Sequence, residues 1–381
     1  MEKTRRNLAK MLSMGIVFPS QLAQGFSSIM ESIPSLEATL SPSEKRALET
    51  NVEALYKKAI VIDGLLIPRG WNEDSFKALD ESGYTGFSAS LASGNLKVAM
   101  AALAEWRDRI DDNPDTLIYA TKAADFVRAK KEDKTAVLLG FQNATMMEKS
   151  IENLDTLYNA GTRWIQLSYN QRNLLGSGCT ERSDGGLSDF GIEALERMNE
   201  LGIIVDLSHC GDQTTNDGLK FSKTGACFNH TMCDALYKDH PRAKTDAQIK
   251  AMADKGGIMS IICLGYMIGP DPGGETTIET YVDHIDHAVK VAGIDHVGVA
   301  SDFAIQGMEA NGATRENWYV PRLTRFKPSY QVRWPAWIEG LDEPKRYYNV
   351  AKVLDKRGYS TGDIEKILGQ NWLRYFEETL K

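Results

Sequence analysis

Two histidines and one aspartate stand where a metal hydrolase needs its reactive groups. His209 and His230 each end a short apolar run, and Asp302 ends a third. Imidazole nitrogens and carboxylate oxygens are ligands that zinc prefers, and a set of two histidines and one carboxylate also suits mononuclear iron. A bound ion can activate water, and a carboxylate beside it can accept the proton. We therefore predict a metal centre with His209 and His230 as ligands and with Asp302 as a catalytic residue or third ligand.

Each of these residues also has a simpler interpretation. A histidine at the end of a strand can serve only as a hydrogen-bonded structural residue, and Asp302 could cap the turn that follows it. Arg242 follows a proline and carries a guanidinium suited to bidentate binding of a substrate carboxylate, but it could instead pair with a surface acid. Both interpretations stay open from the sequence, because the number of ligands decides metal affinity.

The elements that must position these residues follow a repeated pattern. From Lys57 onward, short apolar runs alternate with longer amphipathic stretches, which is typical of parallel strands that are each followed by a covering helix. The predicted strands are Ala59–Ile67, Gly83–Leu91, Thr135–Phe141, Trp164–Tyr169, Ile203–His209, Ala226–His230, Gly257–Cys263 and His296–Asp302. Eight such units predict an α/β fold, a TIM (β/α)8 barrel, whose reactive groups lie at the carboxyl ends of the strands.

Helical spacing marks several of the intervening stretches, including Phe190–Leu201, Thr245–Lys255 and Ile278–Ala292. We expect residues 31–381 to form one barrel domain with additional helices at its C-terminal end. Between residues 304 and 340, after the eighth predicted strand, a long segment rich in aromatic and cationic residues departs from the plain barrel pattern. It could cover the active-site mouth and bind an aromatic or acidic ligand, or it could serve a subunit contact.

The order of motifs after about Leu55 resembles the membrane dipeptidases, peptidase family M19, which have amidohydrolase-like barrels. The most specific matches are the segments Gly185–Gly191, Met198–His209, His240–Arg242 and His284–Phe303, and Gly358–Asn371 resembles the closing helices of the family. The resemblance implies a dipeptide or a small peptide-derived metabolite as substrate, two zinc ions in ordinary members, and a barrel that can form homodimers.

This chain departs from the metal ligands that the resemblance implies. The first strand of family members ends in an Asp-Gly-His-x-Asp segment, but here Leu65 and Ile67 stand where the histidine and the second aspartate belong. Gln142 occupies the place of the glutamate that bridges the two ions, and an amide brings no negative charge to such a bridge. Tyr169 occupies the place of a histidine that polarises the substrate.

The positions that the resemblance retains are His209 and His230 as ligands of one metal, Arg242 for the substrate carboxylate, and Asp302 for the catalytic water. We predict at most one divalent ion, zinc or alternatively iron, with Gln142 as a weak ligand, and no second zinc. Tyr169 is expected to contact the substrate and to donate a proton. Ordinary two-zinc dipeptidase activity is expected to be reduced or lost.

Composition limits the compartment and the partners. The net charge of −8 and the 25% of charged residues describe an ordinary globular chain and argue against nucleic acid as a general partner. Residues 1–30 contain Arg5 and Arg6, then a mildly apolar stretch too short to span a bilayer, then small residues, as in a twin-arginine export signal. We expect a periplasmic protein with no transmembrane segment after signal removal; the alternative is an N-terminal helix that stays attached.

The cysteines do not have the pattern of a disulfide-rich protein. The five of them are scattered, no Cys-x-x-Cys pair occurs, and we expect buried apolar residues, although an oxidising compartment would permit one or two bridges.

Three functions are consistent with these patterns. The first is a divergent metal-dependent hydrolase of dipeptides or small peptide-derived metabolites. The second is a non-hydrolytic tailoring enzyme of the exported compartment with a mononuclear metal site. The third is a non-catalytic protein that binds a peptide or similar ligand. The first two require a metal ion and the third does not, so metal content separates them.

Overall fold

Eight parallel strands close into a barrel in the computed structural model, which describes residues 51–269 and 275–381. The ring runs in the order β2-β1-β10-β9-β7-β6-β5-β4, and β4 pairs with β2 to close it. Its strands are β1 (Ile62–Leu66), β2 (Gly86–Leu91), β4 (Thr135–Phe141), β5 (Trp164–Gln166), β6 (Ile204–Asp206), β7 (Cys227–Cys233), β9 (Ile258–Ile262) and β10 (Val297–Ala300). The predicted TIM barrel and all eight of its predicted strands are confirmed.

Two short strands lie beside this ring and were not predicted. Strand β3 (Leu117–Ala120) pairs with the first half of β4, and β8 (Ala243–Lys244) pairs with the end of β7. Both are too short to show a periodic pattern in the sequence.

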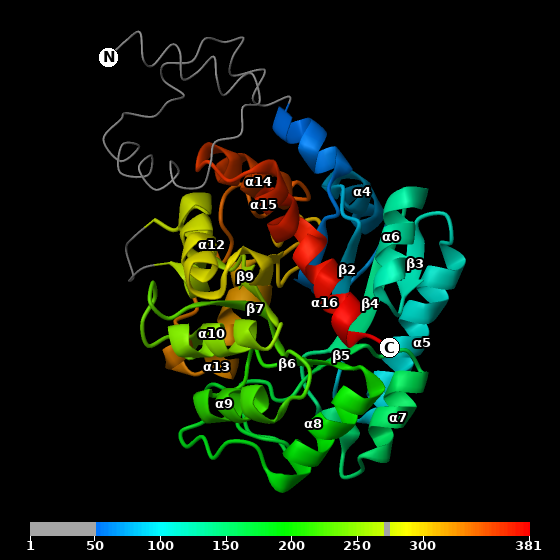
Figure 1. The fold of residues 1–381 in the computed structure, drawn as a ribbon, viewed down its shortest axis with the longest axis vertical. Coiled ribbons are helices and arrows are strands. Elements are labelled where there is room, and N and C mark those ends of the chain that lie inside the picture. Colours follow the sequence, from blue (N-terminus) through cyan, green and yellow to red (C-terminus); the bar gives the residue numbers. More distant parts are fainter. Residues whose placement is uncertain (1–50, 270–274) are drawn as a thin grey trace. The chain divides into compact units, whose positions relative to one another are not determined.

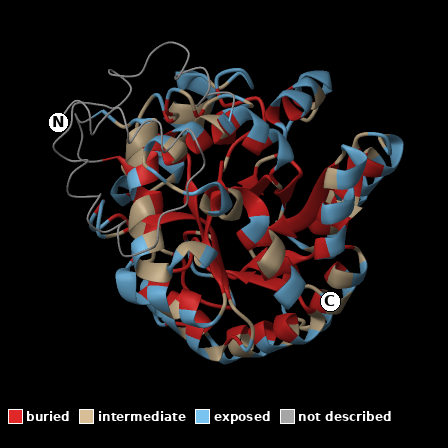
Figure 2. Cartoon of the chain, turned by 45° about the horizontal axis from the view of Figure 1, so that its top comes forward, coloured by how far each residue is buried: buried red, intermediate tan, exposed pale blue. Residues whose placement is uncertain are grey.

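Helices cover the outside of the ring, so that the strands are buried and the outer helical faces are exposed (Figure 2). The helices of the first half are α4 (Glu73–Ser82), α5 (Leu96–Asp112), α6 (Ala123–Glu132), α7 (Glu152–Asn159), α8 (Asp189–Leu201) and α9 (Asp212–Phe221). Those of the second half are α10 (Asp246–Asp254), α11 (Gly265–Ile268), α12 (Ile278–Ala292), α13 (Val320–Arg325), α14 (Arg346–Lys356), α15 (Thr361–Glu365) and α16 (Asn371–Thr379). Helix α10 begins at a capping box in which Thr245 and Gln248 bond each other's backbone N–H groups.

The amino-terminal end of the barrel is closed by α16, which crosses the centre of the ring in Figure 1. The indole of Trp372 donates from Nε1 to Ser260 Oγ inside the barrel at 3.0 Å. Gly64 and Gly298 leave room for this ring, since a Cβ atom on either glycine would come within 3.0 Å of Trp372. One end of the barrel is thus filled by hydrocarbon, and the carboxyl end of the strands is left for polar residues.

The segment between β10 and α14 contains the π-helical turn η4 (Arg315–Tyr319), helix α13 and the 3-10 turn η5 (Pro328–Tyr330). Several of its rings contact one another, including Trp318 with Trp334 and Phe326 with Tyr330. The proposed export signal lies outside the described residues. Within the described residues, no helix is long and apolar enough to cross a membrane. All five cysteines are free, and four are buried.

Candidate active site

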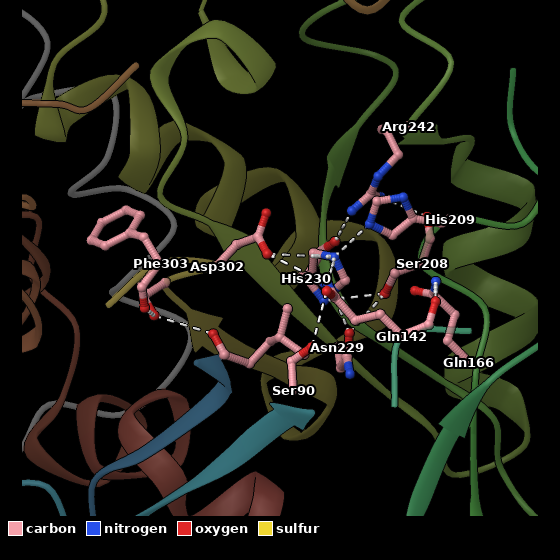
Figure 3. A network of polar contacts seen from close by, with 12 residues as sticks. Ser90, Gln142, Gln166, Ser208, His209, Asn229, His230, Arg242, Asp302 and Phe303 are labelled. Carbon is pink, nitrogen blue, oxygen red and sulfur yellow. Dashed lines mark hydrogen bonds and ion pairs between the residues drawn. The ribbon is translucent and has the colours of Figure 1, made fainter. Parts of the chain in front are cut away.

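The predicted site residues meet at the carboxyl end of the barrel (Figure 3). Gln142 directly follows β4, and Tyr169 lies three residues beyond β5. His209 lies three residues beyond β6, His230 is part of β7, and Asp302 lies two residues beyond β10. The order of strands around the ring brings these five side chains to one mouth, as the sequence pattern predicted.

The two histidines face each other through their Nε2 atoms, which are 2.8 Å apart. The Nδ1 atom of His209 lies 2.7 Å from Asn170 Oδ1, and that of His230 contacts Asn229 Oδ1. Burial, and then the positive charge of Arg242, holds the pKa of both imidazoles well below its usual range, so both rings are neutral.

Gln142 connects this pair to Asp302. Its Nε2 atom lies 3.1 Å from His230 Nε2 and donates to Asp302 Oδ1 at 3.4 Å. Its Oε1 atom accepts a hydrogen bond of 3.0 Å from Ser90 Oγ. The amide is therefore held in place from β2 and presents donor groups to the site, where an ordinary family member would present a carboxylate.

Asp302 and Tyr169 have the protonation states that acid–base chemistry needs. Desolvation raises the pKa of Asp302 to about 7, although Arg242 and the Gln142 amide oppose the shift. Desolvation also raises the pKa of Tyr169 to about 12, so its phenol keeps its proton at neutral pH. The ring of Tyr169 stacks on His209 with centroids 4.1 Å apart. A carboxyl group poised near pH 7 is suited to accept or donate a proton.

Arg242 is not on the wall of the pocket. Its side chain is fully buried, and it donates from Nη1 to Ser208 O at 2.6 Å and from Nη2 to His230 O at 2.9 Å. The guanidinium therefore holds the two segments that carry the histidines. The side chain does not line the pocket in this arrangement, and the contact with a substrate carboxylate stays a prediction.

The residues present do not fit a two-metal centre. Leu65 is fully buried and Ile67 lines the pocket, so hydrocarbon occupies the places of two ligands. Gln142 turns an uncharged amide toward the site. The loss of three ligands on one side of the mouth leaves no set of donors for a second ion.

The residues present suit a site for one ion better than a site for two, but the set of ligands for that one ion is incomplete. If both imidazoles donate from Nδ1 to the asparagine oxygens, the lone pairs of both Nε2 atoms converge and can share one cation or one proton. Neighbouring ligands of a tetrahedral zinc with bonds of ~2.0 Å lie ~3.3 Å apart. The two Nε2 atoms, at 2.8 Å, are closer than this, and Asp302 Oδ1, at 4.0 Å from His230 Nε2, is farther away. Over the described residues, no three His, Cys, Asp or Glu side chains form a group that could hold a metal. The mononuclear site stays a prediction.

A pocket of about 210 Å³ opens above these residues. Its floor includes Gln142, Tyr169, His209 and Asp302. The segment 304–340 supplies much of its wall, so the expected position of that segment over the mouth is observed; the wall residues from it are Met308, Trp318, Arg322, Arg325, Phe326 and Tyr330.

Sequence reasoning missed several contributors. Asn170 supports His209, Ser90 supports Gln142, and Arg69 lies on the pocket wall after β1. Asn170 directly follows Tyr169, and Arg69 closely follows the first predicted strand, so position after a strand was the available signal for both.

A barrel with a histidine pair and an acidic group at its carboxyl end is typical of the amidohydrolase-like class. Comparison with known proteins assigns the chain to one family of this class. Residues 48–324 match the family model described as membrane dipeptidase, peptidase family M19. The chain belongs to this family.

Individual relatives agree with the family. The chain is 29% identical over 266 residues to a dipeptidase, tcpJ, of Claviceps purpurea, covering 69% of this chain and 56% of the relative. It thus spans about half the length of the curated relatives it matches. The crystal structure of an amidohydrolase from Pseudomonas aeruginosa matches with 30% identity and a TM-score of 0.77, over 86% of this chain and 99% of the other. A probable dipeptidase, PvdM, from Pseudomonas aeruginosa shares the fold at 20% identity and a TM-score of 0.72, over 89% of this chain and 99% of that one.

Proposed function

We propose that this protein is a divergent enzyme of the M19 family that acts on a dipeptide or a small peptide-derived metabolite by a hydrolase-like reaction. Membership in a family of metal-dependent dipeptidases supports a peptide substrate and a metal cofactor in general terms. The observation that carries the proposal is the position of Asp302, whose carboxyl group lies on the pocket floor with a pKa of about 7, beside Tyr169 and the neutral histidine pair. The two-zinc mechanism is reduced or lost, because its ligands are replaced.

The roles of the residues follow from their protonation. Asp302 accepts the proton of the attacking water and returns it to the leaving group. The Tyr169 phenol, which stays protonated, donates a hydrogen bond to the oxygen that gains charge in the reaction. One divalent ion, zinc or iron, would bind at His209 and His230 and would supply Lewis-acid chemistry there when present.

The place of action is part of the proposal. A twin-arginine-type signal in residues 1–30 would place the mature protein in the periplasm, where small peptides and their derivatives are accessible. We also propose a homodimer, on the basis of the family resemblance alone.

One observation favours a second candidate, a non-hydrolytic tailoring enzyme. Trp318, Phe326 and Tyr330 give the pocket an aromatic wall that suits a substrate larger than a simple dipeptide. An acid–base pair such as Asp302 and Tyr169 can also move protons on a substrate without adding water. A binding protein without chemistry is the third outcome that the experiment below distinguishes.

The test combines turnover with metal content. The purified full chain is incubated with a panel of dipeptides, the products are identified by mass spectrometry, and transition metals per chain are measured by elemental analysis. We expect poor turnover of simple L-L and L-D dipeptides, addition of water to the true substrate, and at most one ion per chain. A rearranged product without added water would favour tailoring, and binding with no product would favour the third candidate.

The variant that decides the role of the carboxylate is Asp302→Asn. Loss of general acid–base catalysis is expected to lower kcat by about 100-fold or more. Asp80→Asn, at an exposed position of α4, is the matched control and should leave kcat unchanged. Robust, chelator-sensitive hydrolysis of simple dipeptides with two zinc ions per chain would overturn the proposal.

A further inference from the structure

Three arginines reach the pocket from two different segments. Arg69 follows β1, and Arg322 and Arg325 lie one turn apart on α13. Among the described residues that line the pocket, Asp302 is the only carboxylate. Three guanidiniums against one carboxylate give the pocket an excess of positive charge although the whole chain is acidic.

These guanidiniums lack the ion pairs that other arginines of the protein have. Arg357, for comparison, binds carboxylates of Glu279, Asp283 and Asp286 at 2.6 to 2.7 Å. None of the ion pairs found within residues 51–269 and 275–381 involves Arg69, Arg322 or Arg325.

Aromatic rings hold two of these cations in place. The guanidinium of Arg322 lies 3.7 Å from the centroid of a Trp318 ring and donates from Nη1 to Trp318 O at 2.9 Å. Arg325 lies 6.0 Å from the Phe326 ring centroid. Stacking fixes the plane of Arg322 but leaves most of its N–H donors available, which is the arrangement in which arginine binds a carboxylate of a ligand.

Arg242 cannot perform this task in the observed conformation. Two of its nitrogens donate to backbone carbonyls, and the side chain is fully buried. The arginines that line the pocket are therefore the ones placed to contact an acidic substrate.

We propose that the pocket selects an acidic peptide or peptide derivative, whose side-chain carboxylate is bound by Arg322 and Arg325 and whose second carboxylate is bound by Arg69. The inference rests on the proposed function, because it names the class of peptide that the same site accepts. Trp318 and Phe326 also line the pocket, and in this proposal they pack against the apolar part of the substrate.

The experiment compares two peptides that differ only in charge, Ala-Glu and Ala-Gln. Binding to the full chain is measured by calorimetry and by the change in tryptophan fluorescence, to which Trp318 on the pocket wall contributes. Charge-assisted hydrogen bonds are about twice as strong as neutral ones, so Ala-Glu should bind about tenfold more tightly at low salt, and added salt should reduce the difference.

Variants assign the preference to the arginines. Arg322→Gln and Arg325→Gln should each reduce the preference for Ala-Glu several-fold, and Arg322→Lys should retain part of it. Arg315→Gln is the matched control, because Arg315 belongs to the same segment, is exposed and does not line the pocket. It should bind both peptides as the unchanged protein does.

Three results would overturn the inference: equal binding of the two peptides, no binding of either, or loss of the preference in Arg315→Gln as well. Turnover of the same peptides is measured separately. Selective binding of Ala-Glu by a protein that adds water to no peptide or peptide derivative tested would leave the inference intact and remove the proposed function. Addition of water to a peptide substrate together with equal binding of Ala-Glu and Ala-Gln would do the reverse.

Discussion

The two sides of the barrel mouth have diverged to different degrees. On the side formed by β6 and β7, each Nδ1 atom of His209 and His230 keeps a hydrogen bond to an asparagine Oδ1 atom, which accepts it, and the two Nε2 atoms keep their contact. On the side formed by β1 and β4, Leu65, Ile67 and Gln142 replace every charged ligand that the family resemblance implies. A supported histidine pair can remain in place without its ion, whereas buried carboxylates without a cation are costly.

The sharpest way to break this comparison is to restore charge to the β1 and β4 side. The triple variant Leu65→His, Ile67→Asp and Gln142→Glu should bind one more zinc per chain than the unchanged protein, since it regains three ligands. Elemental analysis measures the change, and Gln142→Glu alone is the control, because a single carboxylate supplies too few ligands. If the triple variant folds but gains no zinc, the surrounding packing has changed beyond the ligands themselves.

A second prediction tests whether Arg242 stabilises the segments that carry His209 and His230. Arg242→Gln loses the hydrogen bonds to Ser208 O and His230 O and should lower the free energy of unfolding by about 3 kcal/mol. Denaturant titration measures the loss, and the exposed Arg315→Gln should change it little. A change of less than about 0.5 kcal/mol would show that the backbone alone positions the histidines.

The smallest effect, on the pH dependence of stability, is expected at Asp63, which belongs to β1. Burial raises the pKa of this carboxyl to about 6, despite hydrogen bonds from Ser301 N and Leu65 N. The folded state then binds more protons than the unfolded state between about pH 4 and pH 6, so stability should fall by about 2 to 3 kcal/mol as pH rises through that window.

Asp63→Asn should reduce this dependence, and the part that comes from Asp302, whose pKa is also raised, should remain. Unfolding titrations at several pH values between 4 and 7 measure the slope, and Asp80→Asn, at an exposed position, should leave it unchanged. A slope in Asp63→Asn equal to that of the unchanged protein would assign the pH dependence to other groups.

The sequence predicted the barrel well, because strand and helix periods repeat over the whole described chain. Helix α12 has the predicted bounds, and β4 does as well. Residues at strand ends were also placed correctly, since the fold itself brings them together. The backbone contacts of Arg242 could not be predicted, because only the structure shows that Nη1 and Nη2 each donate to a carbonyl group. Arg69 was missed for a similar reason: its position on the wall depends on how the loop after β1 turns.

The indole of Trp372 has a consequence for how the chain reaches its native state. It fills space next to Gly64 in the first strand of the barrel, although the two residues are near opposite ends of the described chain. Contacts between segments so far apart in sequence slow folding, since a long loop must close before they form. The interior of β1 therefore stays accessible to water until the last helix has been synthesised and has docked. Exposed apolar strands of an incompletely folded chain are prone to aggregation, so the docking of α16 also protects the chain.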